Sequence, residues 1–185
     1  MINQPRSISS SSDEPRWYAA YTYPRHERVV AEQIESRGVE SFLPTSTVAS
    51  RWKDRTARIQ VPLFPSYVFA KVELARRVAV LSIPGVVRIL SANGAPLAIP
   101  DCEIDAVRRC LGEGAKLESH SFLVSGTRVR VRSGPFYGLE GIVTQDDEKY
   151  KVVVSITAIH QSIALELDRE FLEPLLPPPS MLSVA

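Results

Sequence analysis

Cysteine, histidine and long apolar runs are scarce in this chain of 185 residues. The two cysteines, Cys102 and Cys110, stand eight positions apart in one helical pattern, which separates them by about 12 Å along a helix axis. A disulfide cannot bridge that distance, so we interpret both as packing residues in a reduced, cytoplasmic setting. No run of 18 apolar residues occurs, so no membrane-spanning helix is expected.

The motifs of the common enzyme sites are also missing. The sequence has no glycine-rich phosphate loop between a strand and a helix, no HExxH pair and no GxSxG turn. The three histidines, His26, His120 and His160, stand in different segments and do not have the spacing of metal ligands. We therefore expect no catalytic residue, no metal and no cofactor.

The net charge is only +1, but it is divided unevenly along the chain. Residues 16–111 hold 14 Lys and Arg against 9 Asp and Glu, whereas residues 112–185 hold 7 against 10. The basic residues of the first half cluster at the ends of predicted elements, as Arg25-His26 with Arg28, as Arg51, Lys53, Arg55 and Arg58, and as Arg76-Arg77. Any one cluster alone indicates a solvated face, but the three together favour contact with nucleic-acid phosphates.

Residues 16–111 predict an α+β domain, a mostly antiparallel sheet with helices on one face. The expected strands are 17–22, 39–43, 67–72 and 86–90, the expected helices are 26–37, 75–82 and 101–111, and the expected hairpin arms are 45–52 and 56–61. Gly38 and Gly112 are expected to end helices, Asp101 to be a helix N-cap, and Asn93-Gly94 to form a turn.

The strand at 67–72 has two unlike faces, because side chains alternate along a strand. Val68, Ala70 and Val72 form a small aliphatic face that suits packing under helices. Tyr67 and Phe69 form an aromatic face, which is either a second core or a binding surface. The residues alone favour a core, since large aromatic side chains are usually buried.

The pattern changes after residue 111. Residues 112–124 have two glycines and no sustained period, which predicts an interdomain linker. Five short strands then follow within residues 125–176, which predicts a small all-β barrel. The Ser-rich segment 1–15 is not a secretory signal, and both it and the proline-led segment 177–185 are expected to be disordered tails.

Several motifs, in this order, resemble those of NusG-type transcription elongation factors. Trp17-Tyr18, the segment Pro62–Phe69 (PLFPSYVF) and Pro84–Val87 (PGVV) resemble their N-terminal domain, and Gly126–Gly141 resembles the KOW motif of their SH3-like C-terminal barrel. Pro24–Glu27 (PRHE), the FPSY form and Gln161–Glu166 are similar to the specialised antiterminators of the UpxY and RfaH type. The resemblance covers residues 16 to about 176. It implies a monomeric, non-enzymatic cytoplasmic factor that suppresses pausing and termination of transcription, as an operon-specific antiterminator.

The resemblance also implies where such a factor binds. In that family an apolar patch of the N-terminal domain docks on the clamp helices of RNA polymerase, and the residues carried over are Tyr21, Phe64, Pro65, Tyr67 and Phe69. The same resemblance places Arg76 and Arg77 toward the opposite wall of the polymerase cleft and the non-template DNA strand. Arg25, His26 and Arg28 are expected to touch that strand as well.

For the barrel, the resemblance implies a second partner, bound through the loop that holds Ile156, Thr157 and Ile159. General factors usually carry an aromatic residue where this chain has Thr157, which argues against the termination factor Rho and leaves a small-subunit ribosomal protein open. Some relatives refold this domain as helices, but the β-branched run Val152–Ile156 favours strand and hence a barrel. A KOW-type RNA-binding or ribosome-associated protein, with the aromatic face as ordinary core, stays open as the alternative.

Overall fold

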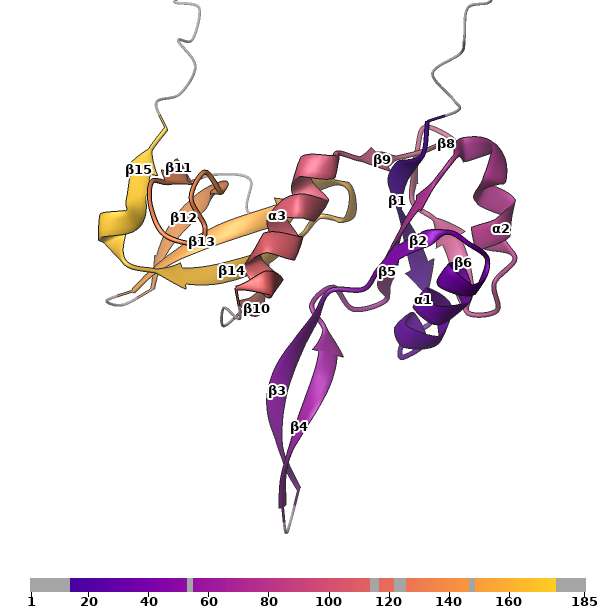
Figure 1. The fold of residues 1–185 in the computed structure, drawn as a ribbon, viewed down its shortest axis with the longest axis horizontal. Coiled ribbons are helices and arrows are strands. Elements are labelled where there is room, and N and C mark those ends of the chain that lie inside the picture. Colours follow the sequence, from indigo (N-terminus) through magenta and orange to yellow (C-terminus); the bar gives the residue numbers. More distant parts are fainter. Residues whose placement is uncertain (1–13, 53–54, 114–116, 122–125, 147–148, 176–185) are drawn as a thin grey trace, which may run out of the picture.

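The computed structural model describes residues 14–52, 55–113, 117–121, 126–146 and 149–175. These residues form an N-terminal α+β domain and a C-terminal antiparallel β domain, with a helix between the two (Figure 1). The expected tail 177–185, and all but the last two residues of the expected tail 1–15, lie outside the described ranges. None of the helices in those ranges combines the length and the apolar character needed to cross a membrane.

The N-terminal sheet is centred on two adjacent strands, β1 and β5. Its strand order is β2-β5-β1-β6, with β9 also paired to β1, and every pair is antiparallel. The strands are β1 (Arg16–Thr22), β2 (Glu40–Phe42), β5 (Tyr67–Val72), β6 (Val86–Ile89) and β9 (Ala98–Ile99). The predicted central strand is therefore confirmed.

Two helices cover the aliphatic face of this sheet, as predicted. They are α1 (Glu27–Ser36) and α2 (Arg77–Leu81), and α2 follows a turn of 3-10 helix, η1 (Leu74–Arg76). Val68 and Ala70 of β5 share one buried cluster with Val30 and Ile34 of α1. Alternation along β5 thus sends its small side chains under the helices and its aromatic side chains to the other face.

The predicted hairpin forms a two-stranded sheet of its own that projects from the domain (Figure 1). Its strands are β3 (Thr45–Trp52) and β4 (Arg55–Pro62), and the turn at 53–54 lies outside the described residues. The register pairs Val48 with Ile59 and Thr47 with Gln60, so the two pairs occupy opposite faces. A short second hairpin, β7 (Ser91–Ala92) and β8 (Ala95–Pro96), encloses the predicted Asn93-Gly94 turn.

The C-terminal domain is one antiparallel sheet in the order β10-β14-β13-β12-β11-β15. Its strands are β10 (Leu117–Ser121), β11 (Thr127–Val131), β12 (Glu140–Asp146), β13 (Lys149–Ile156), β14 (Gln161–Leu167) and β15 (Leu172–Pro174), with the 3-10 turns η2 (Thr157–Ile159) and η3 (Arg169–Phe171). Residues 117–121, expected to be linker, pair with β14 instead. A strand at the edge of a sheet can form through backbone hydrogen bonds to one neighbouring strand, so its sequence need not alternate between apolar and polar residues.

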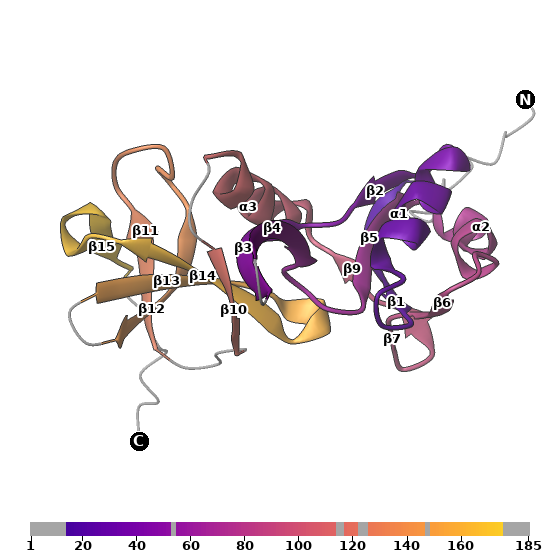
Figure 2. The same ribbon diagram turned by 90° about the horizontal axis from the view of Figure 1, so that it is seen from below.

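Helix α3 (Asp101–Gly112) lies between the sheet of the first domain and the strands of the second (Figures 1 and 2). It covers the face of the N-terminal sheet opposite α1 and α2, so the expectation of helices on one face only is wrong. The helix begins at Asp101 with Pro100 as its N-cap, so the expected capping role of Asp101 is also wrong. Ile104, Val107 and Cys110 are its buried residues, whereas Cys102 is exposed and is not the packing residue that the sequence suggested.

The two cysteines of α3 should differ sharply in reactivity. Burial raises the pKa of the Cys110 thiol to about 11, and this side chain is fully buried. At pH 8 about one Cys110 in a thousand is then a thiolate, and that one is shielded. Titration of the native protein with Ellman's reagent should therefore report one fast thiol per chain, and denaturant should release the second. Cys110→Ser should keep the fast reaction and Cys102→Ser should abolish it; a fast reaction in native Cys102→Ser protein would contradict the packing of α3.

Candidate functional site

The face of the N-terminal sheet that α1 and α2 leave uncovered carries a row of rings. We call it the aromatic face, and its rings are Trp17, Tyr21, Phe42, Phe64, Tyr67 and Phe69. The register sets Tyr21 opposite Tyr67 and Phe42 opposite Phe69. Phe64 meets Phe69 edge to face at 5.8 Å between ring centroids, a favourable geometry for aromatic pairs.

The five predicted polymerase-binding residues lie together on this side but differ in exposure. Phe64 and Phe69 are fully buried, Tyr21 and Tyr67 are half-buried, and Pro65 is exposed. The two tyrosine rings stand 5.4 Å apart, and the guanidinium of Arg88 lies 5.3 Å from the centre of the Tyr21 ring. Burial, and next the neighbouring Tyr21, raise the pKa of Tyr67. The accessible part of the aromatic face is therefore its tyrosine end.

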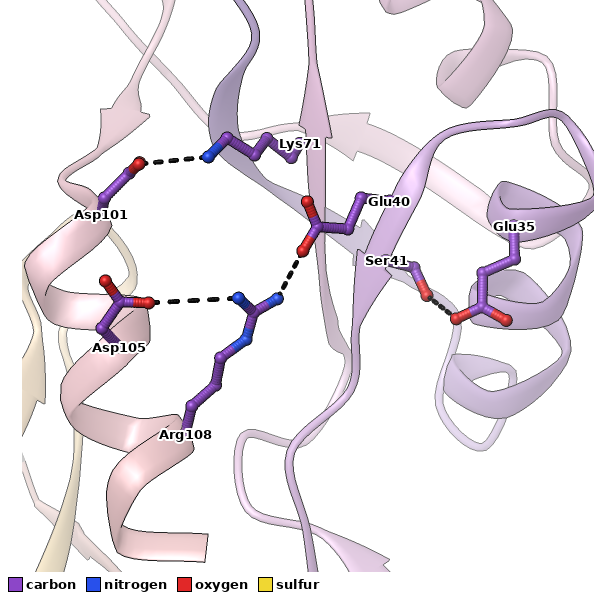
Figure 3. A network of polar contacts seen from close by, with 7 residues as sticks. All are labelled: Glu35, Glu40, Ser41, Lys71, Asp101, Asp105 and Arg108. Atoms are coloured by element: carbon purple, nitrogen blue, oxygen red, sulfur yellow. Dashed lines mark hydrogen bonds and ion pairs between the residues drawn. The ribbon is translucent and has the colours of Figure 1, made fainter. Parts of the chain in front are cut away.

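Helix α3 covers the other end of the aromatic face through Arg108. The Arg108 guanidinium stacks 4.9 Å from the ring centre of Trp17 and 5.0 Å from that of Phe42. Its edges reach the carboxylates of Glu40, at 2.7 Å, and Asp105, at 4.0 Å (Figure 3). Arginine suits this place because a planar, weakly hydrated cation can stack on rings and pair with carboxylates at once. Sequence reasoning missed Arg108, since nothing in a helical pattern marks which arginine meets a ring.

A second ion pair holds the start of α3 to the same sheet. Lys71 of β5 and Asp101 lie 3.1 Å apart, and this carboxylate is largely exposed (Figure 3). Pairs this exposed contribute about 0–1 kcal/mol each. We call the Lys71–Asp101 and Arg108–Glu40 ion pairs the polar seam. They set the orientation of α3 on the sheet more than they stabilise its packing.

The 3-10 turn η2 of the C-terminal domain packs beside α3 in the same apolar cluster as the aromatic face, and we call α3 and η2 together the cover. The backbone N–H of Thr157 donates to the Glu103 carboxylate of α3 at 3.0 Å, and Ile156 and Ile159 are buried beside it. Those two isoleucines belong to the same apolar cluster as Phe64 and Phe69. One hydrophobic core therefore runs from the aromatic face through α3 into the second domain. Of the loop residues singled out from the sequence, only Thr157 is exposed.

A pocket of about 500 Å³, open to solvent, lies beside the contact between α3 and the C-terminal domain. Cys102, Asp105 and Arg109 line it on the helix side, and Arg128, Glu140 and Ser155 line it on the strand side. The apolar cluster shared by the two domains lies next to this pocket.

The predicted nucleic-acid residues lie on the helical layer, away from this cover. Arg25, His26 and Arg28 are all exposed at the start of α1. Arg76 and Arg77 are exposed where η1 leads into α2. Of the four basic residues expected on the hairpin, the structure describes the side chain of Arg58, which is exposed. Within the described ranges, no group of three His, Cys, Asp or Glu side chains is arranged to hold a metal ion.

Comparison with known proteins gives one consistent result. The family profile described as "Transcription termination factor nusG" matches residues 15–108. The chain is 26% identical to the transcription termination/antitermination protein NusG of Rickettsia bellii, over 86% of this chain and 90% of the relative, and 28% identical to that of Escherichia coli K12, over 86% and 96%. The solved structure titled "Domain interaction in Thermotoga maritima NusG" superposes with a TM-score of 0.54 at 23% identity, covering 88% of this chain and 98% of that one.

Reversing the charge at Arg108 should loosen α3 from the sheet. Glutamate at this position would face Glu40 and Asp105 and would lose both ring contacts, so the fully buried Trp17 should become accessible. In a Trp52→Phe background Trp17 is the sole tryptophan, and acrylamide quenching of its fluorescence should rise in Arg108→Glu. Arg76→Glu, a change of equal charge on the exposed helical layer, is the control and should quench like the parent. Equal quenching in both variants would show that Arg108 does not hold the cover.

Proposed function

Because this chain belongs to the NusG family of transcription termination and antitermination proteins, we propose that it binds RNA polymerase through its aromatic face and suppresses pausing and termination. The proposal extends to a specialised role, in which the factor acts as an antiterminator of a particular operon in the cytoplasm. The observation that carries it is the aromatic face itself, a row of rings whose accessible end is formed by Tyr21, Pro65 and Tyr67.

A pair of helices on the polymerase clamp is the partner that this surface suits. Covering about 400 Å² of apolar surface would contribute roughly 10 kcal/mol before association costs are subtracted. A few aromatic side chains usually carry most of the net binding energy at such interfaces. Tyr21 and Tyr67 are placed for first contact, and Phe64 and Phe69 lie next to them in the apolar cluster.

In the structure α3 and η2 occupy part of the surface that the polymerase would use. Full engagement therefore requires these two elements to move away from Trp17, Phe64 and Phe69. The polar seam resists that movement weakly, because the Lys71–Asp101 and Arg108–Glu40 pairs are partly exposed to water. The polymerase helices would replace the apolar contacts that α3 gives up, so the exchange leaves no ring uncovered.

Antitermination then follows from binding one state of the polymerase in preference to another. Pausing and termination require the clamp to open, and a factor that binds only the closed clamp lowers the population of the open one. In this arrangement Arg76 and Arg77 face the opposite cleft wall and the non-template strand, and Arg25, His26 and Arg28 contact the same strand. Their exposure and the absence of carboxylate partners among the described residues support this role.

The C-terminal domain would bind its own partner only after the cover opens. Ile156 and Ile159 are buried in the shared cluster, so the loop around Thr157 cannot present them to a ribosomal protein in the present arrangement. Release from α3 would expose both isoleucines together with the aromatic face.

Removing the accessible rings should abolish polymerase binding. The double variant Tyr21→Ala with Tyr67→Ala leaves the buried Phe64 and Phe69 in place and should weaken co-purification with RNA polymerase at least tenfold, as expected for loss of two anchor residues. Tyr137→Ala removes a ring of the C-terminal domain that is 67% exposed and should bind like the parent chain. Thermal melting must show both variants folded; unchanged binding by a folded double variant would reject the aromatic face as the polymerase site.

A terminator assay tests the direction of the effect. Added to purified RNA polymerase on a template with the upstream region of the operon that encodes this chain, the protein should raise read-through of an intrinsic terminator, because it disfavours clamp opening. A template with an unrelated upstream region should respond less if the factor is operon-specific. Unchanged termination on both templates, with tight binding to free RNA, would favour the KOW-type RNA-binding alternative.

A further inference from the structure

Strained backbone gathers at the end of strand β1, where the aromatic face meets the helical layer. Among the described residues four that are not glycine have a positive φ, and two of them, Arg25 at 67° and Ser66 at 64°, lie here. This conformation costs a residue with a side chain more than it costs glycine. Strained residues persist only where surrounding contacts hold them, and they concentrate at functional sites. The contacts that hold these two residues are therefore informative about function.

Both strained residues occupy the same position in two turns of one kind. The N–H of His26 donates to the carbonyl of Tyr23 at 3.1 Å, which closes the first turn. The N–H of Tyr67 donates to the carbonyl of Phe64 at 3.2 Å, which closes the second. Each turn has proline at its second position and the strained residue at its third, the pattern of a type II turn, in which glycine is the usual third residue. A turn of this type without glycine needs support from its surroundings.

The Glu27 carboxylate supplies that support to the second turn. Glu27 directly follows the first turn as the first residue of α1, and it is only 6% exposed. Its Oε1 accepts the backbone N–H of Ser66 at 2.8 Å. The negative charge suits this place, because the helix dipole favours an anion in the first turn and a carboxylate accepts an N–H more strongly than a neutral oxygen does. The carbonyl of Ser66 accepts the N–H of Thr22 of β1 at 2.8 Å, so the strained residue is held between helix and sheet.

The second turn determines where the accessible end of the aromatic face lies. Ser66 stands between Pro65, which is exposed, and Tyr67, which begins β5. The Tyr67 ring lies 5.4 Å from the Tyr21 ring, and the register of β1 and β5 pairs these two residues directly. A negative φ at Ser66 would change the direction in which the chain enters β5, at the point where this ring pair forms. The tyrosine end therefore depends on a carboxylate from a helix on the other face of the sheet.

We propose that Glu27 is a positioning residue for the polymerase contact, which holds the second turn in its strained form and thereby places Pro65 and Tyr67 for binding. The inference rests on the proposed function, in which these two residues meet the clamp helices. Because Glu27 also directly follows the first turn, it sets the position of the aromatic face relative to the basic residues at the start of α1. Glu27 is too buried to contact either partner itself.

The affinity of the full chain for purified RNA polymerase tests this role. Glu27→Met keeps a side chain of similar length but removes the acceptor, so the second turn should relax in most molecules. If about a tenth of them keep the competent turn, the affinity falls about tenfold. Glu27→Asp keeps the charge but withdraws it from Ser66 by one methylene group, so it should show the same loss. It also tests the role independently if Glu27→Met does not fold.

Two further variants are the controls for the hydrogen bond. Glu27→Gln keeps an oxygen that can accept the Ser66 N–H and should bind within about threefold of the parent chain. Glu35→Met removes a carboxylate that accepts from the Ser41 hydroxyl near the other end of α1, and it should bind like the parent. Thermal melting must show each compared variant folded at the temperature of the titration.

A substitution in the turn separates positioning from general stability. Ser66→Gly removes the cost of the positive φ, so the turn no longer needs the carboxylate. Glu27→Met combined with Ser66→Gly should therefore bind within about threefold of the parent, whereas glycine in a turn would not repair lost packing of α1. A binding defect of folded Glu27→Met that survives in the double variant would overturn the proposal, and so would parent-like binding by folded Glu27→Met or Glu27→Asp.

Fluorine NMR of protein made with fluorotyrosine reads the turn without polymerase. The Tyr67 resonance, assigned by its absence in Tyr67→Phe, should move toward that of free fluorotyrosine in Glu27→Met, because the ring leaves its half-buried place against Tyr21. It should return in the double variant and stay unchanged in Glu27→Gln. If the parent chain does not bind polymerase, the proposed function fails while this shift still decides whether Glu27 holds the turn. If the parent binds and the resonance is unchanged in folded Glu27→Met and Glu27→Asp, the inference fails and the polymerase contact stands.

Discussion

The stacking of Arg108 between Trp17 and Phe42 is the contact on which the arrangement of the two domains depends. It places a cation, and with it one side of α3, against rings that would otherwise face water. The same helix contributes Ile104, Val107 and Cys110 to a core that continues into the C-terminal strands. Helix α3 therefore contacts both domains through one continuous core. A flexible linker in its place would divide that core into two parts.

The two sides of α3 are held by related contacts. Toward the sheet Ile104, Val107 and Cys110 share one buried cluster with Trp17, Phe64 and Phe69, and partly exposed ion pairs, which water and salt weaken, flank that apolar contact. Toward the C-terminal domain the same cluster continues beside a solvent-open pocket of about 500 Å³. Ion pairs that water weakens and an apolar contact that another apolar surface could replace are what the proposed exchange of α3 for polymerase helices requires.

Much of this fold could be predicted from the sequence because local signals agreed with the final packing. Alternation along β5 predicted which face lies under α1 and α2, and Asn93-Gly94 predicted its turn. The expectations that failed depend on contacts between distant residues. Asp101 is a residue type that often caps helices, but α3 begins at Asp101 itself, after Pro100, and the Asp101 carboxylate pairs with Lys71. Residues 117–121 have no alternating pattern, and they form a strand through pairing with β14. For the site, sequence motifs marked the tyrosines and phenylalanines, but only the three-dimensional packing brings Arg108 and η2 onto them.

The turn between Phe64 and Tyr67 connects helix α1 to the accessible end of the aromatic face. Ser66 has a φ of +64°, a left-handed conformation that costs a residue with a side chain more than it costs glycine. Two hydrogen bonds offset that cost, since Ser66 donates its N–H to Glu27 and accepts the N–H of Thr22 at 2.8 Å. The Glu27 carboxylate at the start of α1 therefore fixes the backbone that carries Pro65 and Tyr67. A change that removes this acceptor would release the turn at Ser66 and shift the accessible end of the aromatic face, so the helical layer and the aromatic face depend on each other through one strained residue.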